Sequence, residues 1–285
     1  VSTSVPLGRF GCGIEHDDCP VAGGLRQPIA ETVESKRDVN EIAEFQPWPL
    51  EAPAASLAVG EVHVWLADLR QPAERLAALA ATLTADERER AARFRFPEHR
   101  DRFIAGRGLL RELLARYLDR SAAALRFEPG PHGKPMVAGA DAGSGLHFNL
   151  SHSGDGALYA ISRREVGVDL ERLDRTLNFA AIIDRVCTPR ELARFRSQPP
   201  ERERETFFAC WTRKEAIAKA LGGGLASGLR KLEVCLADGM HADGRVVLRD
   251  AAGRQWSVLN LPLGPGWEGA LAAAGADWRW RGWRL

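Results

Sequence analysis

The feature that most constrains this chain is a residue pattern that occurs twice, at a constant offset of 104 residues. The offset superimposes three separated groups: Val62, Val64, Leu66 and Leu69 on Val166, Val168, Leu170 and Leu173; Thr84 and Glu87 on Thr188 and Glu191; Phe103 and Ala105 on Phe207 and Ala209. One offset shared by three groups indicates an internal duplication. We therefore expect an α+β fold of two pseudo-symmetric lobes, each an antiparallel sheet packed on a long helix.

The start of the chain lies outside this repeat. It has few periodic apolar patterns and several closely spaced prolines, which are typical of a linker. We expect a disordered N-terminal extension over residues 1–60, an N-terminal lobe over 61–165 and a C-terminal lobe over 166–285. A zinc site would need a fourth ligand and finger spacing, which are missing around the candidates Cys12, His16 and Cys19.

Composition narrows the class of protein. The 285 residues are 45% hydrophobic and 27% charged, which is typical of a soluble globular protein. The net charge of +1 gives no general argument for nucleic-acid binding. No apolar run is long enough to span a membrane, the N-terminus lacks a signal-peptide pattern, and the five cysteines have no disulfide-framework spacing. We expect a cytoplasmic monomer that binds neither nucleic acid nor membrane.

Two acidic segments are the strongest candidates for a functional site. The run Trp211–Ala220 has no Pro or Gly and is followed by glycines, so it predicts a helix on which Glu215 and Lys219 share a face. The run Val166–Glu171 predicts a strand, with Asp169 and Glu171 on one side. Three carboxylates brought together would suit Mg²⁺. The alternatives are a surface ion pair, worth under about 1 kcal/mol, and a solvated sheet end.

The two halves differ chemically at these positions. At the constant offset, Trp65 and Ala67 replace the two strand carboxylates, and Arg111 replaces Glu215. Arg107 shares a helix face with Arg111, so a cleft between the lobes would be acidic on one wall and basic on the other. That combination suits a metal-bound polyphosphate. The alternative is that the arginines are ordinary solvated surface.

Two further segments lie between these elements. Gly133, Lys134 and Pro135 predict a turn that projects a lysine. The segment Leu146–Gly154 predicts a strand that ends in polar residues. Its Ser151 and His152 point to opposite faces of the strand and are poor catalytic partners, and no nucleophile elbow is present.

Together these segments resemble the Sfp-type 4′-phosphopantetheinyl transferases over about residues 61–285. That family carries G-K-P, F-N-(I/L)-S-H-(S/T), G-(V/I)-D-(V/I/L)-E and W-x-x-K-E-(A/S)-x-x-K in this order. The matching segments here are Gly133–Pro135, Phe148–Ser153, Gly167–Glu171 and Trp211–Lys219. The family often has an aromatic residue just after the second segment, where this chain has Gly154, Asp155 and Gly156.

The resemblance implies an enzyme of the holo-acyl-carrier-protein synthase type. It would transfer the 4′-phosphopantetheine arm of coenzyme A to a serine of an apo acyl or peptidyl carrier protein and release adenosine 3′,5′-bisphosphate. Such carriers serve polyketide, nonribosomal-peptide and fatty-acid synthesis. Mg²⁺ would be held by Asp169, Glu171 and Glu215. Glu215 would take the serine proton, directly or through a water, and Lys219 would stabilise the departing phosphate oxygen.

The resemblance also assigns the coenzyme A contacts to seven residues: Arg107, Gly133, Lys134, Pro135, Asn149, Ser151 and His152. Lys214 would either fix Glu215 or touch the diphosphate. Two rival interpretations stay open from the residues alone. One is a Mg²⁺-dependent phosphohydrolase or nuclease, which would release phosphate from simple esters without a carrier. The other is a non-catalytic module that binds a nucleotide or a carrier domain.

Overall fold

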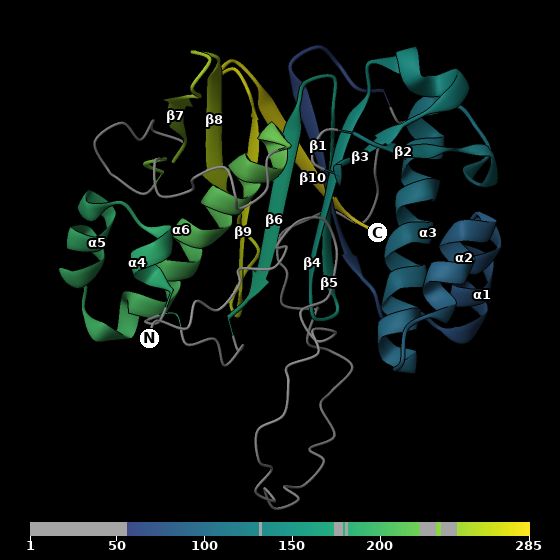
Figure 1. Cartoon of the computed structure of the whole chain (residues 1–285), viewed down its shortest axis with the longest axis horizontal. Coiled ribbons are helices and arrows are strands. Elements are labelled where there is room, and N and C mark those ends of the chain that lie inside the picture. Colours follow the sequence, from purple (N-terminus) through teal and green to yellow (C-terminus); the bar gives the residue numbers. More distant parts are fainter. Residues whose placement is uncertain (1–55, 131–132, 174–178, 180–181, 223–231, 235–243) are drawn as a thin grey trace, which may run out of the picture.

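The structure, a computed structural model, describes residues 56–130, 133–173, 179, 182–222, 232–234 and 244–285. Most of the expected N-terminal extension, with Cys12, His16 and Cys19, therefore lies outside the described residues. The described part forms two lobes whose sheets face each other, with helices α1–α3 on the outside of one and α4–α6 on the outside of the other (Figure 1).

The first lobe begins with a strand, continues with a run of α-helices and ends with strands. Its elements are β1 (Glu61–Asp68), α1 (Ala73–Thr82), α2 (Ala85–Ala92), α3 (Pro97–Leu118), η1 (Ala122–Ala124), β2 (Phe127–Pro129), β3 (Pro135–Val137), η3 (Gly139–Ser144), β4 (His147–Ser153) and β5 (Gly156–Ser162). Strands β2 and β3 form a separate hairpin, and the main sheet has the order β10-β1-β5-β4.

The second lobe repeats this plan. Its elements are β6 (Val166–Arg172), α4 (Ile183–Val186), α5 (Pro189–Arg196), α6 (Pro200–Leu221), β7 (Val246–Arg249), β8 (Gln255–Asn260) and β9 (Trp267–Ala274). Its sheet has the order β6-β9-β8-β7. In the first sheet β1 pairs with β5 and β5 with β4, and in the second sheet β6 pairs with β9 and β9 with β8, all antiparallel. The predicted α+β fold of two pseudo-symmetric lobes is confirmed.

The helices of the two lobes also match each other. The long helices α3 and α6 both have 22 residues, begin with proline and end at a left-handed residue. The short helices before them both begin with the predicted Thr and Glu pair. The Thr84 backbone N–H donates to Glu87 Oε2 at 3.0 Å, and the Thr188 backbone N–H donates to Glu191 Oε2 at 2.8 Å. This reciprocal cap fixes where each helix starts.

The last strand, β10 (Arg279–Arg284), departs from the expected division at residue 165. It pairs in parallel with β1 and so completes the sheet of the first lobe. Arg279 donates to Glu61 Oε1 at 3.1 Å, and the ring of Trp283 packs 5.1 Å from that of Trp65. The chain therefore crosses back after β9, and residues 279–284 do not belong to the second sheet.

Three apolar cores hold the layers together. One lies between each sheet and its own helices, and the third lies between the two sheets. Val168 and Leu170 point into this third core, where they meet Val62 and Val64 of β1. The strand face that carries Asp169 and Glu171 is therefore turned the other way, towards α6, as the alternation predicts.

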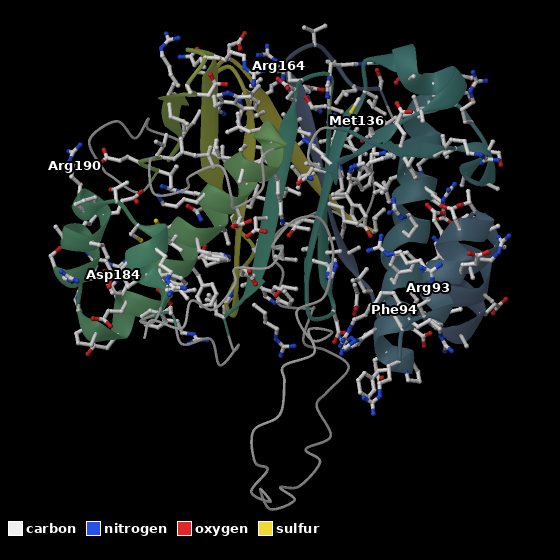
Figure 2. The ribbon with its side chains drawn as sticks, in the orientation of Figure 1. Arg93, Phe94, Met136, Arg164, Asp184 and Arg190 are labelled. Carbon is white, nitrogen blue, oxygen red and sulfur yellow. The ribbon has the colours of Figure 1, made fainter. Side chains whose placement is uncertain are left out.

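Charged side chains mark the outer surface. Arg190 and Asp184 lie on the second lobe and Arg93 on the first, and Arg164, in the turn before β6, pairs with Asp277 at 2.7 Å (Figure 2). Within the described part of the chain, no helix combines the length and the apolar character needed to cross a bilayer.

Candidate active site

The acidic residues meet because β6 and α6 are in backbone contact. At Gly167 an added Cβ would collide with the Ala216 carbonyl oxygen and the Ala220 backbone nitrogen of α6. Only glycine lets the strand approach the helix this closely. The contact lies two residues before Asp169 and one turn from Lys219, so it sets the distance between the carboxylates of the strand and the side chains of the helix.

Gly167→Ala is therefore expected to destabilise the protein by about 1–3 kcal/mol or more, because helix backbone must move to admit the methyl group. Urea unfolding followed by circular dichroism measures the change. Gly143→Ala is the matched control, since its Cβ would meet nothing within 4 Å, and it should stay within about 0.5 kcal/mol of wild type. An equal loss of unfolding free energy in the two variants would contradict a special role for the close contact at Gly167.

Lys219 and Asp169 form the centre of the site. The Lys219 ammonium donates to Asp169 Oδ1 at 2.6 Å and to Ser151 Oγ at 2.8 Å. Two other carboxylate oxygens, Asp169 Oδ2 and Glu215 Oε1, are buried without any hydrogen-bond partner. A buried, unpaired carboxylate oxygen is costly unless something compensates it, so the two atoms indicate a place for a cation.

The ionisation of these groups supports the same conclusion. Burial raises the pKa of Asp169 to about 6, against the opposing effect of Lys219. Burial and the neighbouring Asp169 raise the pKa of Glu215 to about 8. Burial alone would lower the pKa of Lys219, but the Asp169 and Glu215 carboxylates outweigh it and raise that pKa. One ammonium group does not neutralise the cluster, and a divalent cation would.

Glu171 completes the acidic set and is held from two sides. Its Oε1 accepts from Trp211 Nε1 at 3.1 Å, and its Oε2 accepts from Ser153 Oγ at 3.1 Å. Asp169, Glu171 and Glu215 thus offer hard oxygen ligands at one place, and this donor set fits Mg²⁺. Asp169 and Glu171 on β6 lie near enough to Glu215 on α6 to raise its pKa, so the three residues predicted to bind the metal share one region of negative charge.

A tighter group of possible ligands lies elsewhere in the second lobe. Among the described residues, Cys187, Glu191 and Cys210 are the one group of three whose ligand atoms all lie within 4.8 Å of one another. Both oxygens of Glu191 already have partners, because Oε1 accepts from Val234 N at 2.9 Å and Oε2 pairs with Lys214 at 2.8 Å. The unsatisfied charge is therefore at the Asp169 cluster, whose carboxylates are more widely spaced.

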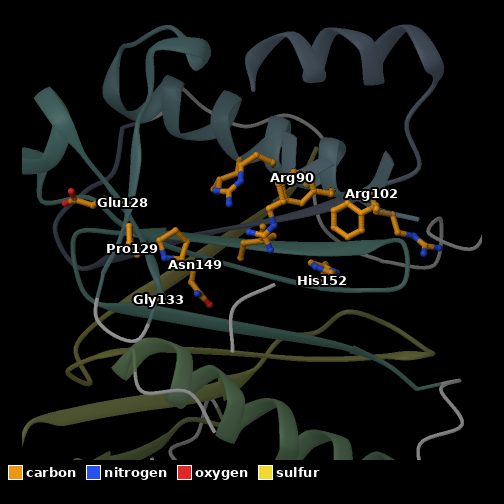
Figure 3. Close-up of a pocket in the computed structure, with 14 residues that line it drawn as sticks. Arg90, Arg102, Glu128, Pro129, Gly133, Asn149 and His152 are labelled. Atoms are coloured by element: carbon orange, nitrogen blue, oxygen red, sulfur yellow. The ribbon is translucent and has the colours of Figure 1, made fainter. Parts of the chain in front are cut away.

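A cavity of about 310 Å³ lies in the first lobe, between α2, α3, β4 and the β2–β3 hairpin (Figure 3). Five of the seven residues predicted to contact coenzyme A line it: Arg107, Gly133, Pro135, Asn149 and His152. His152 also links the cavity to the acidic cluster. Burial, with Lys219 and Arg102 nearby, lowers its pKa to about 4, so its imidazole is neutral at physiological pH.

Two more arginines line the cavity that the sequence did not single out. Arg102 donates to Asp155 at 2.7 Å, and the Arg90 guanidinium lies 5.2 Å from the centre of the Phe103 ring. Arg107 pairs with Glu87 at 3.5 Å. Several arginines follow one another along this part of the chain, and sequence spacing did not show which of them turn inwards.

The other two predicted coenzyme A contacts lie outside the cavity lining. Lys134 reaches across to the second lobe, where its ammonium donates to the Val166 carbonyl at 2.7 Å and the Ala220 carbonyl at 3.5 Å. Its charge thus lies at the C-terminal end of α6, where the helix dipole favours a cation. Ser151 points to the acidic cluster, where it donates to Asp169 Oδ1 at 2.9 Å.

Neither expected role of Lys214 matches its position. Lys214 is fully buried on the other side of α6 and pairs with Glu191, the capping residue of α5. The first lobe has the same pair, Arg111 with Glu87 at 2.7 Å. Arg111 therefore corresponds to Lys214, at an offset of 103, and the residue that corresponds to Glu215 is Glu112.

This correspondence corrects the expectation that Arg111 replaces Glu215. Helices α3 and α6 begin at Pro97 and Pro200, so the offset falls by one residue before them. The match of Phe103 and Ala105 with Phe207 and Ala209 is therefore also out of register by one residue, and the constant offset of 104 holds only up to the capping pairs. The first lobe does keep a carboxylate at the matching position, but Glu112 pairs with Arg75 at 2.8 Å instead of joining an acidic cluster. The arginines that line the cavity of the first lobe are Arg90, Arg102 and Arg107, while Arg111 is buried in its ion pair with Glu87.

Comparisons with known proteins agree with this arrangement. A family model described as "4′-phosphopantetheinyl transferase superfamily" matches residues 165–274, and one described as "4′-phosphopantetheinyl transferase, N-terminal" matches residues 70–163. The first match contains the whole acidic cluster, and the second contains every residue that lines the cavity.

Similar proteins carry the same description. The chain is 41% identical over 237 residues to 4′-phosphopantetheinyl transferase HetI of a Nostoc species, covering 83% of this chain and 97% of the relative. It is 34% identical over 202 residues to a putative 4′-phosphopantetheinyl transferase of a Synechocystis species, covering 70% and 80%. It is 26% identical over 196 residues to 4′-phosphopantetheinyl transferase Sfp of Bacillus subtilis, covering 68% and 84%.

Proposed function

Because the chain belongs to the 4′-phosphopantetheinyl transferase family, we propose that it moves the 4′-phosphopantetheine arm of coenzyme A to a serine of an apo acyl or peptidyl carrier protein. The reaction depends on Mg²⁺ and releases adenosine 3′,5′-bisphosphate. The observation that carries this proposal is the pair of buried, unpaired carboxylate oxygens, Asp169 Oδ2 and Glu215 Oε1, beside an arginine-lined cavity.

The cavity suits the nucleotide end of coenzyme A. Arg90, Arg102 and Arg107 line it with guanidinium groups, which would bind phosphate oxygens through charge-assisted hydrogen bonds. Phe94 and Phe103 give the same cavity apolar surface for an adenine ring. His152, at the end nearer Lys219, would contact the phosphates as a neutral donor. With the nucleotide end held here, the diphosphate would extend towards the acidic cluster.

The chemistry would take place at the acidic cluster. A bound Mg²⁺ would neutralise the diphosphate and polarise the P–O bond that breaks. Glu215, which the bound cation would keep ionised, would take the proton of the carrier serine, directly or through a water. The serine oxygen then forms the new bond to phosphorus as the old P–O bond breaks. Lys219 would stabilise the charge on the departing bisphosphate.

The nucleophile belongs to the partner, so the chain needs no triad of its own. The proposed partners are carrier domains of fatty-acid, polyketide or nonribosomal-peptide synthesis, and the proposed setting is a cytoplasmic monomer that binds no nucleic acid. Within the family, the activity that we propose is of the holo-acyl-carrier-protein synthase type.

Intact-mass spectrometry of apo carrier domains tests the proposal. Incubation with the protein, coenzyme A and Mg²⁺ should add the mass of phosphopantetheine, and a chelator should prevent the addition. Asp169→Asn should lose the addition at low Mg²⁺ concentration, because one ligand of the cation is weakened. Failure to modify carrier domains from all three kinds of synthesis would sink the proposal.

Arg90 provides a prediction for the cavity. Arg90→Ala is expected to raise the KM for coenzyme A about tenfold, because one charge-assisted hydrogen bond to phosphate is worth about 1.5–3 kcal/mol. Arg93→Ala is the matched control, since Arg93 is exposed on the same turn and lies outside the cavity. Steady-state kinetics at saturating carrier protein gives the KM for coenzyme A of each variant. An equal rise in KM in Arg90→Ala and Arg93→Ala would indicate general charge attraction instead of a contact in the cavity.

A further inference from the structure

The two sheets face each other across a shared core, and along one side their edge strands β4 and β6 are also joined by side chains. Strand β4 ends one sheet and β6 ends the other. Alternate residues of β4 accept hydrogen bonds from alternate backbone N–H groups of β6: Asn149 Oδ1 from Val168 at 2.8 Å, Ser151 Oγ from Leu170 at 3.3 Å and Ser153 Oγ from Arg172 at 3.2 Å. We call this set of three bonds the polar seam.

The two serines of the seam also donate hydrogen bonds to carboxylates of β6. Each hydroxyl donates its one proton to the carboxylate that precedes the N–H group it accepts from. Ser151 donates to Asp169 Oδ1 at 2.9 Å, and Ser153 donates to Glu171 Oε2 at 3.1 Å. The same unit is thus repeated two residues further along both strands. The backbone of β6 orients the hydroxyl, and the hydroxyl orients the carboxylate.

Asn149 makes the seam bond alone. The residue that precedes its partner Val168 is Gly167, which has no side chain to orient. The seam bond of Asn149 therefore joins the lobes without contacting a carboxylate. A variant at this position tests the joining of the lobes separately from the orientation of a carboxylate.

Glu171 receives a second donor from the other side. Trp211 Nε1, on α6, donates to Glu171 Oε1 at 3.1 Å, while Ser153 comes from β4 of the first lobe. Each oxygen of this carboxylate thus accepts from a donor that fixes its direction, and a carboxylate oxygen can accept more than one partner. A ligand held from both lobes cannot rotate away when the cation is absent.

We propose that Ser153 and Trp211 are positioning residues that hold Glu171 ready for the catalytic cation. The inference rests on the proposed function and gives Ser153 a role different from the phosphate contacts expected for its segment. Donors behind a metal ligand typically change metal affinity by about 10–100-fold. Because Ser153 comes from the first lobe and Glu171 from the second, the packing of the two lobes against each other also orients this metal ligand.

Binding of Mn²⁺ to the coenzyme-free protein, followed by electron paramagnetic resonance of the free ion, tests this role. Ser153→Ala and Trp211→Phe should each weaken Mn²⁺ binding about tenfold or more, while thermal unfolding reports whether each variant is folded. Asn149→Ala should lower the melting temperature through loss of a seam bond but keep wild-type Mn²⁺ affinity. Wild-type affinity in both Ser153→Ala and Trp211→Phe would overturn the proposal, as would equal weakening in Asn149→Ala.

A kinetic measurement separates this proposal from a direct phosphate contact. At saturating metal, Ser153→Ala should keep the wild-type KM for coenzyme A. A higher KM with unchanged Mn²⁺ affinity would place Ser153 on the substrate and overturn its positioning role. The Mn²⁺ titration needs no carrier protein, so it gives its answer even where the transfer reaction fails, and the two proposals can fail separately.

Discussion

Glu215→Gln is expected to lower the rate of carrier modification by about 10²–10⁴-fold and, at the same time, to stabilise the metal-free protein. The rate falls because the amide cannot accept the serine proton. The stability rises because the buried Glu215 carboxylate lies near Asp169 and Glu171 and has an oxygen without a partner. Each unit by which folding raises the pKa of a carboxyl group costs about 1.4 kcal/mol of stability once that group is ionised. We therefore expect the free energy of unfolding of Glu215→Gln to exceed that of wild type by at least about 1 kcal/mol at pH 8.

The pH dependence of this gain has a definite sign. The folded pKa of Glu215 is raised from 4.5 to about 8, so the unfolded state ionises first and wild-type stability is lost as pH rises between those values. The advantage of Glu215→Gln should therefore be full near pH 8 and shrink towards pH 5. Urea unfolding of both proteins in the presence of a chelator, at pH 8 and at pH 5, measures the difference in the free energy of unfolding. If Glu215→Gln were less stable than wild type at pH 8, the claim that the ionised Glu215 carboxylate destabilises the metal-free protein would be wrong.

Lys214→Met is expected to destabilise the fold by about 3–5 kcal/mol, because it leaves Glu191 charged and buried without its ammonium partner. The variant should keep the wild-type KM for coenzyme A at a temperature where it remains folded. Unfolding by urea and steady-state kinetics give the two values.

The duplication supplies a matched variant in the other lobe. Arg111→Met breaks the equivalent pair with Glu87 and should cost a similar free energy of unfolding. If Lys214→Met instead left stability unchanged and raised the KM for coenzyme A, Lys214 would belong to the substrate site and the pairing of capping glutamates with long-helix cations would have no structural role.

Local patterns predicted much of this fold. The repeated offset located both capping pairs and the matching strands because it depends on short-range periodicity and on helix starts. The acidic set was also predictable, since a two-residue strand spacing and a four-residue helix spacing each fix a shared face. A glycine at position 167 had no assigned reason until the structure placed it against the backbone of α6.

Other features depend on contacts that sequence spacing does not encode. Lys214 and Glu215 are neighbours in the chain but lie about 100° apart around the helix, so one enters the core and the other the site. A single-residue change in offset before α6 mismatched Arg111 with Glu215. The pairing of β10 with β1 joins residues more than two hundred positions apart, as in Arg279 with Glu61. The segment Phe148–Ser153 showed polar residues, but not that alternate ones face the other lobe.

The central claim is that the fold brings Asp169, Glu171 and Glu215 together to hold one divalent cation between β6 and α6. Anomalous X-ray diffraction from crystals grown with Mn²⁺ and coenzyme A locates such an ion directly. We predict one strong anomalous peak within bonding distance of these carboxylates, next to the diphosphate. A peak at Cys187, Glu191 and Cys210 instead, or no peak with coenzyme A clearly bound, would contradict the account.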